Sequence, residues 1–238
     1  MGILNQIVLS TAPWMPKIVI GRIASVYVAG DKLEDGIDLV RKLNKKGFVG
    51  TLDLLGEEVK NRRGITKTTN SYCDLIDGIA NSGVDCNISL KLTAIGLKVD
   101  ESLCWDNLSV ILDKAKMYNT FVRMDMEDSE VTESTIQMCK KAVNYYPNCG
   151  TVLQAYMYRT SDDIDLLKGP NTNIRLCKGA YKESKDIAIQ DYNKIRENYV
   201  ECAEKMIKNN IYSCFATHDT WIIAVSYTHL TLPTNREV

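Results

Sequence analysis

The 238-residue sequence has little of several features that would place it quickly in a class of protein. It holds two histidines, and its eight cysteines form no C-x-x-C pair, so a structural zinc site is not expected. The 29 basic and 30 acidic side chains leave a net charge of −1, which excludes binding to a nucleic-acid backbone by charge. Hydrophobic residues make up 45% of the chain, as in ordinary globular proteins, which excludes disordered and low-complexity classes.

Long hydrophobic runs are also missing. The apolar first 20 residues lack a basic segment and are interrupted by Pro13 and Pro16, so they resemble neither a signal peptide nor a membrane span. Several cysteines occupy apolar positions, where a free thiol behaves as a small hydrophobic group, and this usage is typical of a reducing compartment. We therefore expect a cytoplasmic protein without a transmembrane segment.

What the sequence has instead is a regular alternation of short apolar runs and longer helical stripes. The runs predict six strands, about 30 residues apart, as repeated βα units require. The predicted strands are 48–54, 87–93, 120–126, 151–156, 173–177 and 212–217. A helix over 32–46, which Asp31 could cap, precedes the first strand, and Thr160 with Asp163 predicts a capping box after the fourth.

Two parallel folds fit this order, an open doubly wound sheet and a (β/α)₈ barrel. Polar residues alternate with apolar ones in two predicted strands, as at Ser89 and Lys91 and at Arg123 and Asp125. The central strands of an open sheet are buried on both faces, whereas a barrel interior can hold a polar ligand. No G-x-G-x-x-G follows any strand. We predict an α/β fold, an incomplete TIM-like (β/α)₈ barrel with about six of its eight units.

The sequence also predicts a division of the chain into three parts. Residues 1–30 are expected to be an N-terminal extension and residues 31–224 the barrel. After residue 224 the chain becomes rich in threonine and contains Pro233. Such a break at a terminus is typical of a non-native segment, so we expect residues 225–238 to be an atypical tail and the barrel to be truncated at its C-terminal side.

Polar side chains lie where each predicted strand ends, and in a barrel these ends meet at the rim that carries the active site. They are Asp53, Lys91, Asp125, Glu127, Gln154, Arg175, Lys178, Thr217, His218 and Asp219. The three cations predict an anionic ligand, unless Lys91 and Arg175 pair internally with Asp125 and Glu127.

Several of these residues have more than one interpretation. Asp125 could be a base, could orient a cation, or could be the counter-ion of Arg123. Asp125 and Glu127 share a strand face and could begin a metal site, although such sites need more oxygen ligands than this pattern offers. Gln154 needs a fixed hydrogen-bond partner in the interior. His218 could cap the following helix, contact a phosphate or act in catalysis.

Five of the strand-end segments occur together in one known family. They are SLKLT (89–93), FVRMDMED (121–128), VLQAYMYRT (152–160), IRLCKGAYKE (174–183) and FATHD (215–219). In this order they resemble the bacterial proline dehydrogenase family of the monofunctional, flavin-dependent type, and residues 27–57 are similar to its first helix and strand. The resemblance extends from about residue 19 to residue 223.

The resemblance implies a flavin-dependent barrel that oxidises L-proline to 1-pyrroline-5-carboxylate, the first step of proline degradation. FAD would be bound noncovalently and electrons would pass to a membrane quinone, in a cytoplasmic protein that can be peripheral at the inner face of the membrane. The family places a pair of arginines on its last helix, and this sequence ends before them. We therefore expect this chain to bind FAD weakly and to turn over slowly.

Residue roles follow from the same resemblance. Lys91 would bind the proline carboxylate, Asp125 would be the active-site acid, and Arg175 would lie beside the flavin N5. No metal is implied. The residues implied to contact the cofactor are Met126, Gln154, Lys178, Gly179, Ala180, Thr217 and His218.

Two other functions remain as alternatives. The first is a Schiff-base lyase or aldolase that acts on an anionic substrate through Lys91 or Lys178, which borohydride trapping would reveal. The second is an inactive barrel fragment that serves only as a binding module. Loss of the strand-end polar residues would indicate such decay, but all of them are present through the sixth predicted strand.

Overall fold

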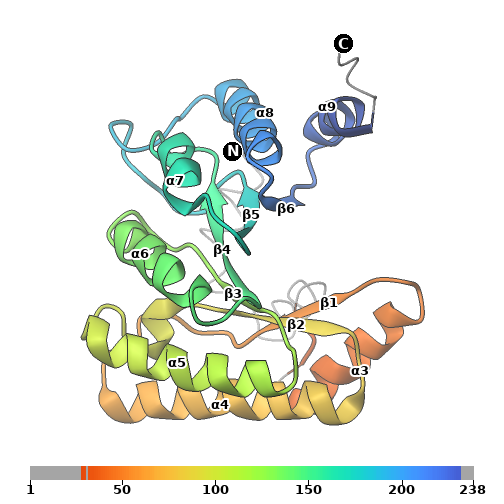
Figure 1. Cartoon of the computed structure of the whole chain (residues 1–238), viewed down its shortest axis with the longest axis vertical. Helices are drawn as coiled ribbons and strands as arrows, with labels where there is room; N and C mark the ends of the chain where they lie inside the picture. Colours follow the sequence, from red (N-terminus) through yellow and green to blue (C-terminus); the bar gives the residue numbers. More distant parts are fainter. Residues whose placement is uncertain (1–27, 31, 232–238) are drawn as a thin grey trace, which may run out of the picture.

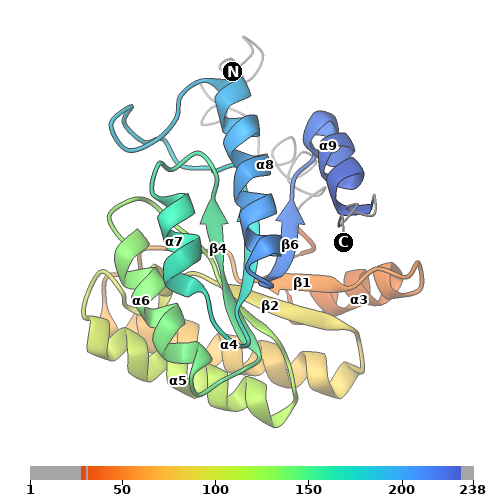
Figure 2. The same cartoon turned by 45° about the horizontal axis from the view of Figure 1, so that its top comes forward.

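A computed structural model describes residues 28–30 and 32–231 (Figure 1). Within them, six parallel strands form one sheet in the order β1-β2-β3-β4-β5-β6. The strands are β1 (Gly50–Asp53), β2 (Cys86–Leu90), β3 (Val122–Met124), β4 (Cys149–Gln154), β5 (Asn173–Cys177) and β6 (Tyr212–Ala216). Figure 2 shows that β1 and β2 run across the direction of β4 and β6, so the sheet curls into a half-barrel.

Helices cover the outside of this sheet, and at least one follows every strand (Figures 1 and 2). They are α3 (Leu33–Asn44), α4 (Arg62–Ser82), the 3₁₀-helix η2 (Leu92–Ile95), α5 (Glu101–Met117), α6 (Thr132–Val143), α7 (Thr160–Leu167), α8 (Tyr192–Lys208) and α9 (Thr220–Thr231). The described residues thus contain six consecutive βα units, which confirms the predicted incomplete barrel. None of the described helices is long and apolar enough to cross a bilayer.

The alternation of side chains decides which face of the sheet meets the helices. Ile88, Leu90 and Met124 have no exposed surface and pack in the core beneath the helices, where each contributes about 1.5–3 kcal/mol of burial free energy. The strand register aligns Asp53 with Ser89, and Ser89 with Arg123. Aligned residues of parallel strands share a face, so the polar side chains lie together on the concave side.

A buried arginine fills the lower part of this concave face. The Arg123 guanidinium donates to Thr151 O at 3.1 Å and to Asn173 Oδ1 at 2.8 Å. Gly150 makes room for it, because a Cβ there would lie 2.2 Å from Asn173 O and 3.1 Å from Arg123 Nη1. The interpretation of Asp125 as the counter-ion of Arg123 is therefore wrong, since carbonyl and amide oxygens satisfy this guanidinium instead.

Local signals near the helix ends were less reliable. The predicted capping box is absent: Thr160 Oγ1 donates to Gln154 O, and the Asp163 carboxylate binds the Arg159 side chain at 2.9 Å instead of a backbone N–H. The second strand ends at Leu90 because the next residues turn into η2. The proposed cap Asp31 lies outside the described residues.

The division of the chain remains a prediction. Most of the expected N-terminal extension lies outside the described residues. At the other end, α9 continues through Thr231, so the change of composition after residue 224 is not a break in the helix.

Candidate active site

Three side chains from different strands meet at the carboxyl end of the concave face. Arg175, on β5, donates from Nη2 to Asp125 Oδ1 at 2.5 Å, and Asp125 directly follows β3. Ser89, on β2, donates to the same oxygen at 2.5 Å. Hydrogen bonds between ionised groups are shorter and stronger than neutral ones, so this contact fixes both the carboxylate and the guanidinium.

Burial raises the pKa of Asp125 above its ordinary value. The charge of Arg175 and the hydrogen bond from Ser89 act in the opposite direction but do not cancel the effect of burial. Asp125 therefore takes up a proton more readily than a free aspartate. A partly buried acid with a tunable protonation state is typical of an active site.

Lys91 forms a second ion pair beside the first. Its Nζ lies 2.9 Å from Asp53 Oδ2, and the Tyr72 hydroxyl donates to Asp53 Oδ1 at 2.9 Å. Burial lowers the pKa of Lys91, but the hydrogen bond and charge of Asp53 outweigh burial, so the pKa lies above the ordinary value. Lys91 thus stays an ammonium ion. The alternative that both cations pair internally therefore holds in part: Arg175 pairs with Asp125 as that alternative states, whereas Lys91 pairs with Asp53 and not with Asp125 or Glu127.

Glu127 and Gln154 connect the loops above the strands. The buried Glu127 carboxylate accepts from Thr93 N at 3.0 Å and from Thr93 Oγ1. Gln154 Nε2 donates to Glu127 O at 3.0 Å, and its Oε1 accepts from Ala180 N at 3.2 Å. The prediction that Gln154 has fixed partners is confirmed, and both partners are backbone groups.

A third cluster lies at the ends of β5 and β6. Asp219 Oδ2 accepts from Lys178 Nζ at 3.0 Å, Arg196 Nε at 2.8 Å and Tyr192 OH at 2.6 Å. The hydrogen bond from Arg196 contributes most to holding the pKa of Asp219 far below its usual range. Asp219 Oδ1 also accepts from Trp221 N at 3.1 Å, so Asp219, not His218, caps α9. Two cations therefore share one carboxylate.

The segment after β5 depends on a close backbone approach. Gly179 has φ +129°, and a Cβ there would lie 2.3 Å from Tyr156 Cδ1. Only glycine fits against this ring, and Tyr156 N donates to Lys178 O at 2.8 Å. From the sequence alone, Gly179 could allow either a close approach to a ligand or a tight turn. In the structure Gly179 lies close to the Tyr156 ring, and both Gly179 and Ala180 are exposed at the rim.

The remaining predicted residues are less tightly organised. Thr217 is half-buried and its hydroxyl accepts from Asp219 N at 3.0 Å, whereas His218 is exposed. Met126 is buried and packs in the core. Sequence reasoning missed Tyr72, Arg196 and Tyr192, because they lie on helices. Ser89 could have been found, since it lies on the polar face of a predicted strand.

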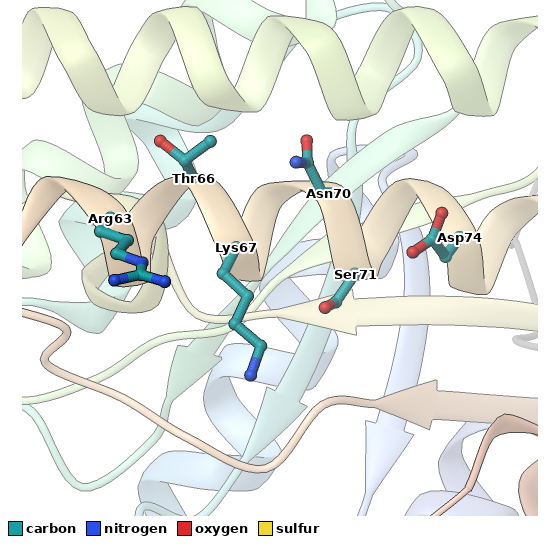
Figure 3. Close-up of a pocket in the computed structure, with 6 residues that line it drawn as sticks. All are labelled: Arg63, Thr66, Lys67, Asn70, Ser71 and Asp74. Atoms are coloured by element: carbon teal, nitrogen blue, oxygen red, sulfur yellow. The ribbon is translucent and has the colours of Figure 1, made fainter.

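A cavity of about 590 Å³ lies away from these strand ends, along α4 (Figure 3). Figure 3 shows its six lining residues on this one helix, Arg63, Thr66, Lys67, Asn70, Ser71 and Asp74. Tyr72, which binds Asp53, is fully buried on another face of α4. This cavity contains none of the residues that converge on the concave face.

Comparison with known sequences identifies the family. The sequence model described as proline dehydrogenase matches residues 37–231. The chain belongs to the proline dehydrogenase family. It is 35% identical over 222 residues to proline dehydrogenase 2 of Bacillus subtilis (strain 168), covering 93% of this chain and 71% of that protein. It is 34% identical over 206 residues to the proline dehydrogenase of Deinococcus radiodurans, covering 84% of this chain and 66% of that protein.

Solved structures of proline dehydrogenase relatives share the fold. Proline utilization A (PutA) from Bdellovibrio bacteriovorus, inactivated by N-propargylglycine, matches with a TM-score of 0.83 at 20% identity, over 91% of this chain and 28% of that chain. A mutant PutA of Bradyrhizobium japonicum matches with a TM-score of 0.70 at 21% identity, over 85% and 25%. The predicted resemblance and the barrel fold are both confirmed.

Proposed function

We propose that this protein oxidises L-proline to 1-pyrroline-5-carboxylate with noncovalently bound FAD. The observation that carries the proposal is the convergence of Lys91, Asp125 and Arg175, from three strands, at the carboxyl end of one concave face. Barrel enzymes place their active sites at this end of the strands. Membership of the proline dehydrogenase family supports the same reaction.

The first task of such a site is to bind a small zwitterion. Lys91 remains protonated, and its side chain is 21% exposed, so its ammonium can donate to the proline carboxylate as a point charge. Asp53 restricts where Nζ can lie, and Tyr72 in turn orients Asp53. Positioning of this kind lowers the barrier by holding the reacting carbon in one place.

The second task is to stabilise charge. FAD, when bound, would accept the hydride that leaves the ring carbon next to the proline nitrogen. We assign to Arg175 the role of stabilising the negative charge that develops on this acceptor. Asp125 holds the Arg175 guanidinium from one side at 2.5 Å, which keeps its charge directed toward one place.

Residues at the other end of the face fit the cofactor. Lys178 and Arg196 share the single carboxylate of Asp219, which leaves one positive charge for a phosphate group. Gly179 and Ala180, which directly follow Lys178, are exposed. On the resemblance, we assign Gln154, Met126, Thr217 and His218 to the cofactor as well.

Product trapping tests this function. The protein would be incubated with FAD, L-proline and an artificial electron acceptor, and 1-pyrroline-5-carboxylate would be trapped with o-aminobenzaldehyde as a coloured adduct. We expect the adduct with L-proline, and at proline concentrations below KM about 10–100-fold less of it in the Lys91→Ala variant. Absence of adduct from a protein that has bound FAD would overturn the proposal.

The Schiff-base alternative is less well supported. A lysine that attacks a carbonyl must be deprotonated, and a lowered pKa is the usual means. Lys91 has a raised pKa, which holds it as an ammonium ion, and the Lys178 side chain is engaged in an ion pair with Asp219. Borohydride in the presence of a carbonyl substrate should leave both lysines unmodified in a mass spectrum.

The electron acceptor and the location follow from the resemblance. We assign a membrane quinone as acceptor and the cytoplasmic face of the membrane as the place of electron transfer. With L-proline as electron donor, the protein should therefore reduce a quinone in lipid vesicles faster than it reduces oxygen. Equal rates of reduction of the two acceptors would contradict this assignment.

A further inference from the structure

One lysine outside the ion pairs described above joins three loops at the mouth of the half-barrel. Lys98 Nζ lies 2.6 Å from Glu58 Oε1, 2.9 Å from Asp128 Oδ2 and 3.2 Å from Glu130 Oε2. Glu58 belongs to the loop after β1, Lys98 to the loop after η2, and both other acids to the loop after β3. Lys98 therefore ties together the loops that follow the first three strands.

Two further contacts turn this clamp into a closed ring of loops. In the loop after β3, Ser129 donates from N and Oγ to the Glu183 carboxylate, at 2.8 and 2.7 Å, in the loop after β5. In that loop, Tyr181 OH donates to Glu57 Oε2 at 3.2 Å, back in the loop after β1. In the sheet β1 and β5 are separated by three strands, so a contact between the loops that follow them spans the mouth.

The ring lies beside the substrate-binding lysine. Glu57 is one of the charges that raise the pKa of Lys91. Glu58 N donates to Thr93 Oγ1 at 2.9 Å, and Thr93 in turn binds the buried Glu127 carboxylate. The loops of the ring therefore rest on the same residues that line the candidate site.

Without Lys98 the ring would be unfavourable. Glu58, Asp128 and Glu130 all approach the same Nζ, and three carboxylates that close repel one another unless a cation lies between them. The backbone of Glu58 also has φ +53°, a left-handed conformation that residues other than glycine seldom adopt. Its side-chain contact with Lys98 helps to hold this conformation.

We propose that Lys98 is a positioning residue for the reaction, which holds the loops after β1 and β3 together so that the Tyr181–Glu57 contact closes the ring over Lys91, Asp125 and Arg175. Its effect on the reaction rests on the proposed function, whereas its effect on the loops does not. A closed ring retains the substrate and excludes water. Loss of Lys98 should therefore raise KM for proline more than it lowers kcat.

Hydrogen exchange of the protein without ligand tests the clamp directly. In Lys98→Gln we expect amides of residues 54–61 and 125–131 to exchange about tenfold faster, and Lys98→Arg should restore protection. The matched control is Lys114→Gln, which removes a similarly exposed lysine that binds both oxygens of Asp77 on α4. That control should leave both loops unchanged.

A double variant tests whether the carboxylates repel one another when Lys98 is absent. Adding Glu58→Gln to Lys98→Gln removes part of this repulsion and should recover the protection of the loops from exchange.

Steady-state kinetics test the effect on the reaction. Lys98→Gln should raise KM for proline by about fivefold or more with kcat within about twofold, because retention of substrate is lost while the chemistry is kept. Loops that exchange as in the Lys114 control, or faster exchange spread equally over α4 and α5, would overturn the proposal. A protein that does not oxidise proline would refute the proposed function while leaving the exchange result readable.

Discussion

The two ends of the concave face differ in how many cations pair with each carboxylate. At the end formed by β1 to β3 and Arg175, each cation has its own carboxylate: Lys91 with Asp53 and Arg175 with Asp125. At the β5–β6 end, Lys178 and Arg196 share Asp219. A neutral set of ion pairs can bind a zwitterion without leaving a charge unbalanced, whereas a surplus cation needs an anion.

The same ends differ in burial and in the protonation of their acids. The Asp219 side chain is 1% exposed and has a depressed pKa, because it accepts from the side chains of Arg196, Tyr192 and Lys178. The Asp125 side chain is 19% exposed and has a raised pKa, because burial outweighs its partners. Asp219 is thus held ionised by its partners and fixes their positions. Asp125 is ionised at a cost in free energy, as groups in functional sites often are.

The largest expected effect is the loss of reaction rate when Arg175 is removed. Arg175→Ala should slow flavin reduction at saturating proline by about 10²–10³-fold, because it removes a charge that stabilises the transition state. Stopped-flow absorbance would measure this rate. Arg159→Ala is the matched control, since Arg159 also pairs with a buried aspartate, Asp163, but on α7 outside the site. An unchanged rate in Arg175→Ala would rule out the assigned role.

Lys91→Ala should act on substrate binding. Loss of a charge-assisted hydrogen bond of about 1.5–3 kcal/mol predicts a rise of about 10–100-fold in KM for proline, with little change in bound FAD. Steady-state kinetics and the flavin-to-protein ratio would measure both. Lys205→Ala, which removes an ion pair with Asp165 away from the site, should change neither. If Lys91→Ala abolishes folding instead, its pair with Asp53 is structural.

Asp219→Asn should lower the free energy of unfolding more than Asp125→Asn does. A depressed pKa means that Asp219 contributes stability above about pH 4, which is lost as the pH falls toward its folded-state pKa. The variant should lose about 2–3 kcal/mol of unfolding free energy at neutral pH, because two cations lose their acceptor but both are partly exposed. Asp125→Asn should lose activity with a smaller loss of stability, since its raised pKa has the opposite sign. Urea unfolding would compare them, and equal losses would contradict this contrast.

The smallest predicted effect is a change in pH dependence. The hydrogen bond from Ser89 lowers the pKa of Asp125, so Ser89→Ala should raise that pKa further. The acid limb of kcat/KM should then move to higher pH. Ser134→Ala, which removes a similar bond to the exposed Glu101, should leave the profile in place. A shift to lower pH would show that another group controls this limb.

The fold could be predicted because period and polarity are local properties of the sequence. The alternation around Ser89 and Arg123 marked one face of two strands as polar, and the barrel followed from it. The ends of the elements were predicted less well, because tertiary contacts decide them. Thr160, for example, binds Gln154 O instead of capping α7, since that carbonyl lies within reach only in the folded chain.

The partners within the site could not be predicted for a similar reason. A strand-end position indicates that Lys91 faces the concave side, but not that Asp53 lies closer to it than Asp125. Arg196 and Tyr72 reach the site from helices, and no repeat in the sequence marks which turn of a helix approaches a strand end. Pairing depends on distances set by the whole sheet, which a local pattern does not contain.

The most direct test of the account is anaerobic addition of L-proline to the FAD-loaded protein while the absorbance of the oxidised flavin is recorded. If Lys91, Asp125 and Arg175 bind proline against the cofactor, the absorbance should fall on mixing, and Arg175→Ala should slow this fall while FAD stays bound. A protein that holds FAD in stoichiometric amount but keeps its absorbance at saturating L-proline would contradict the central claim.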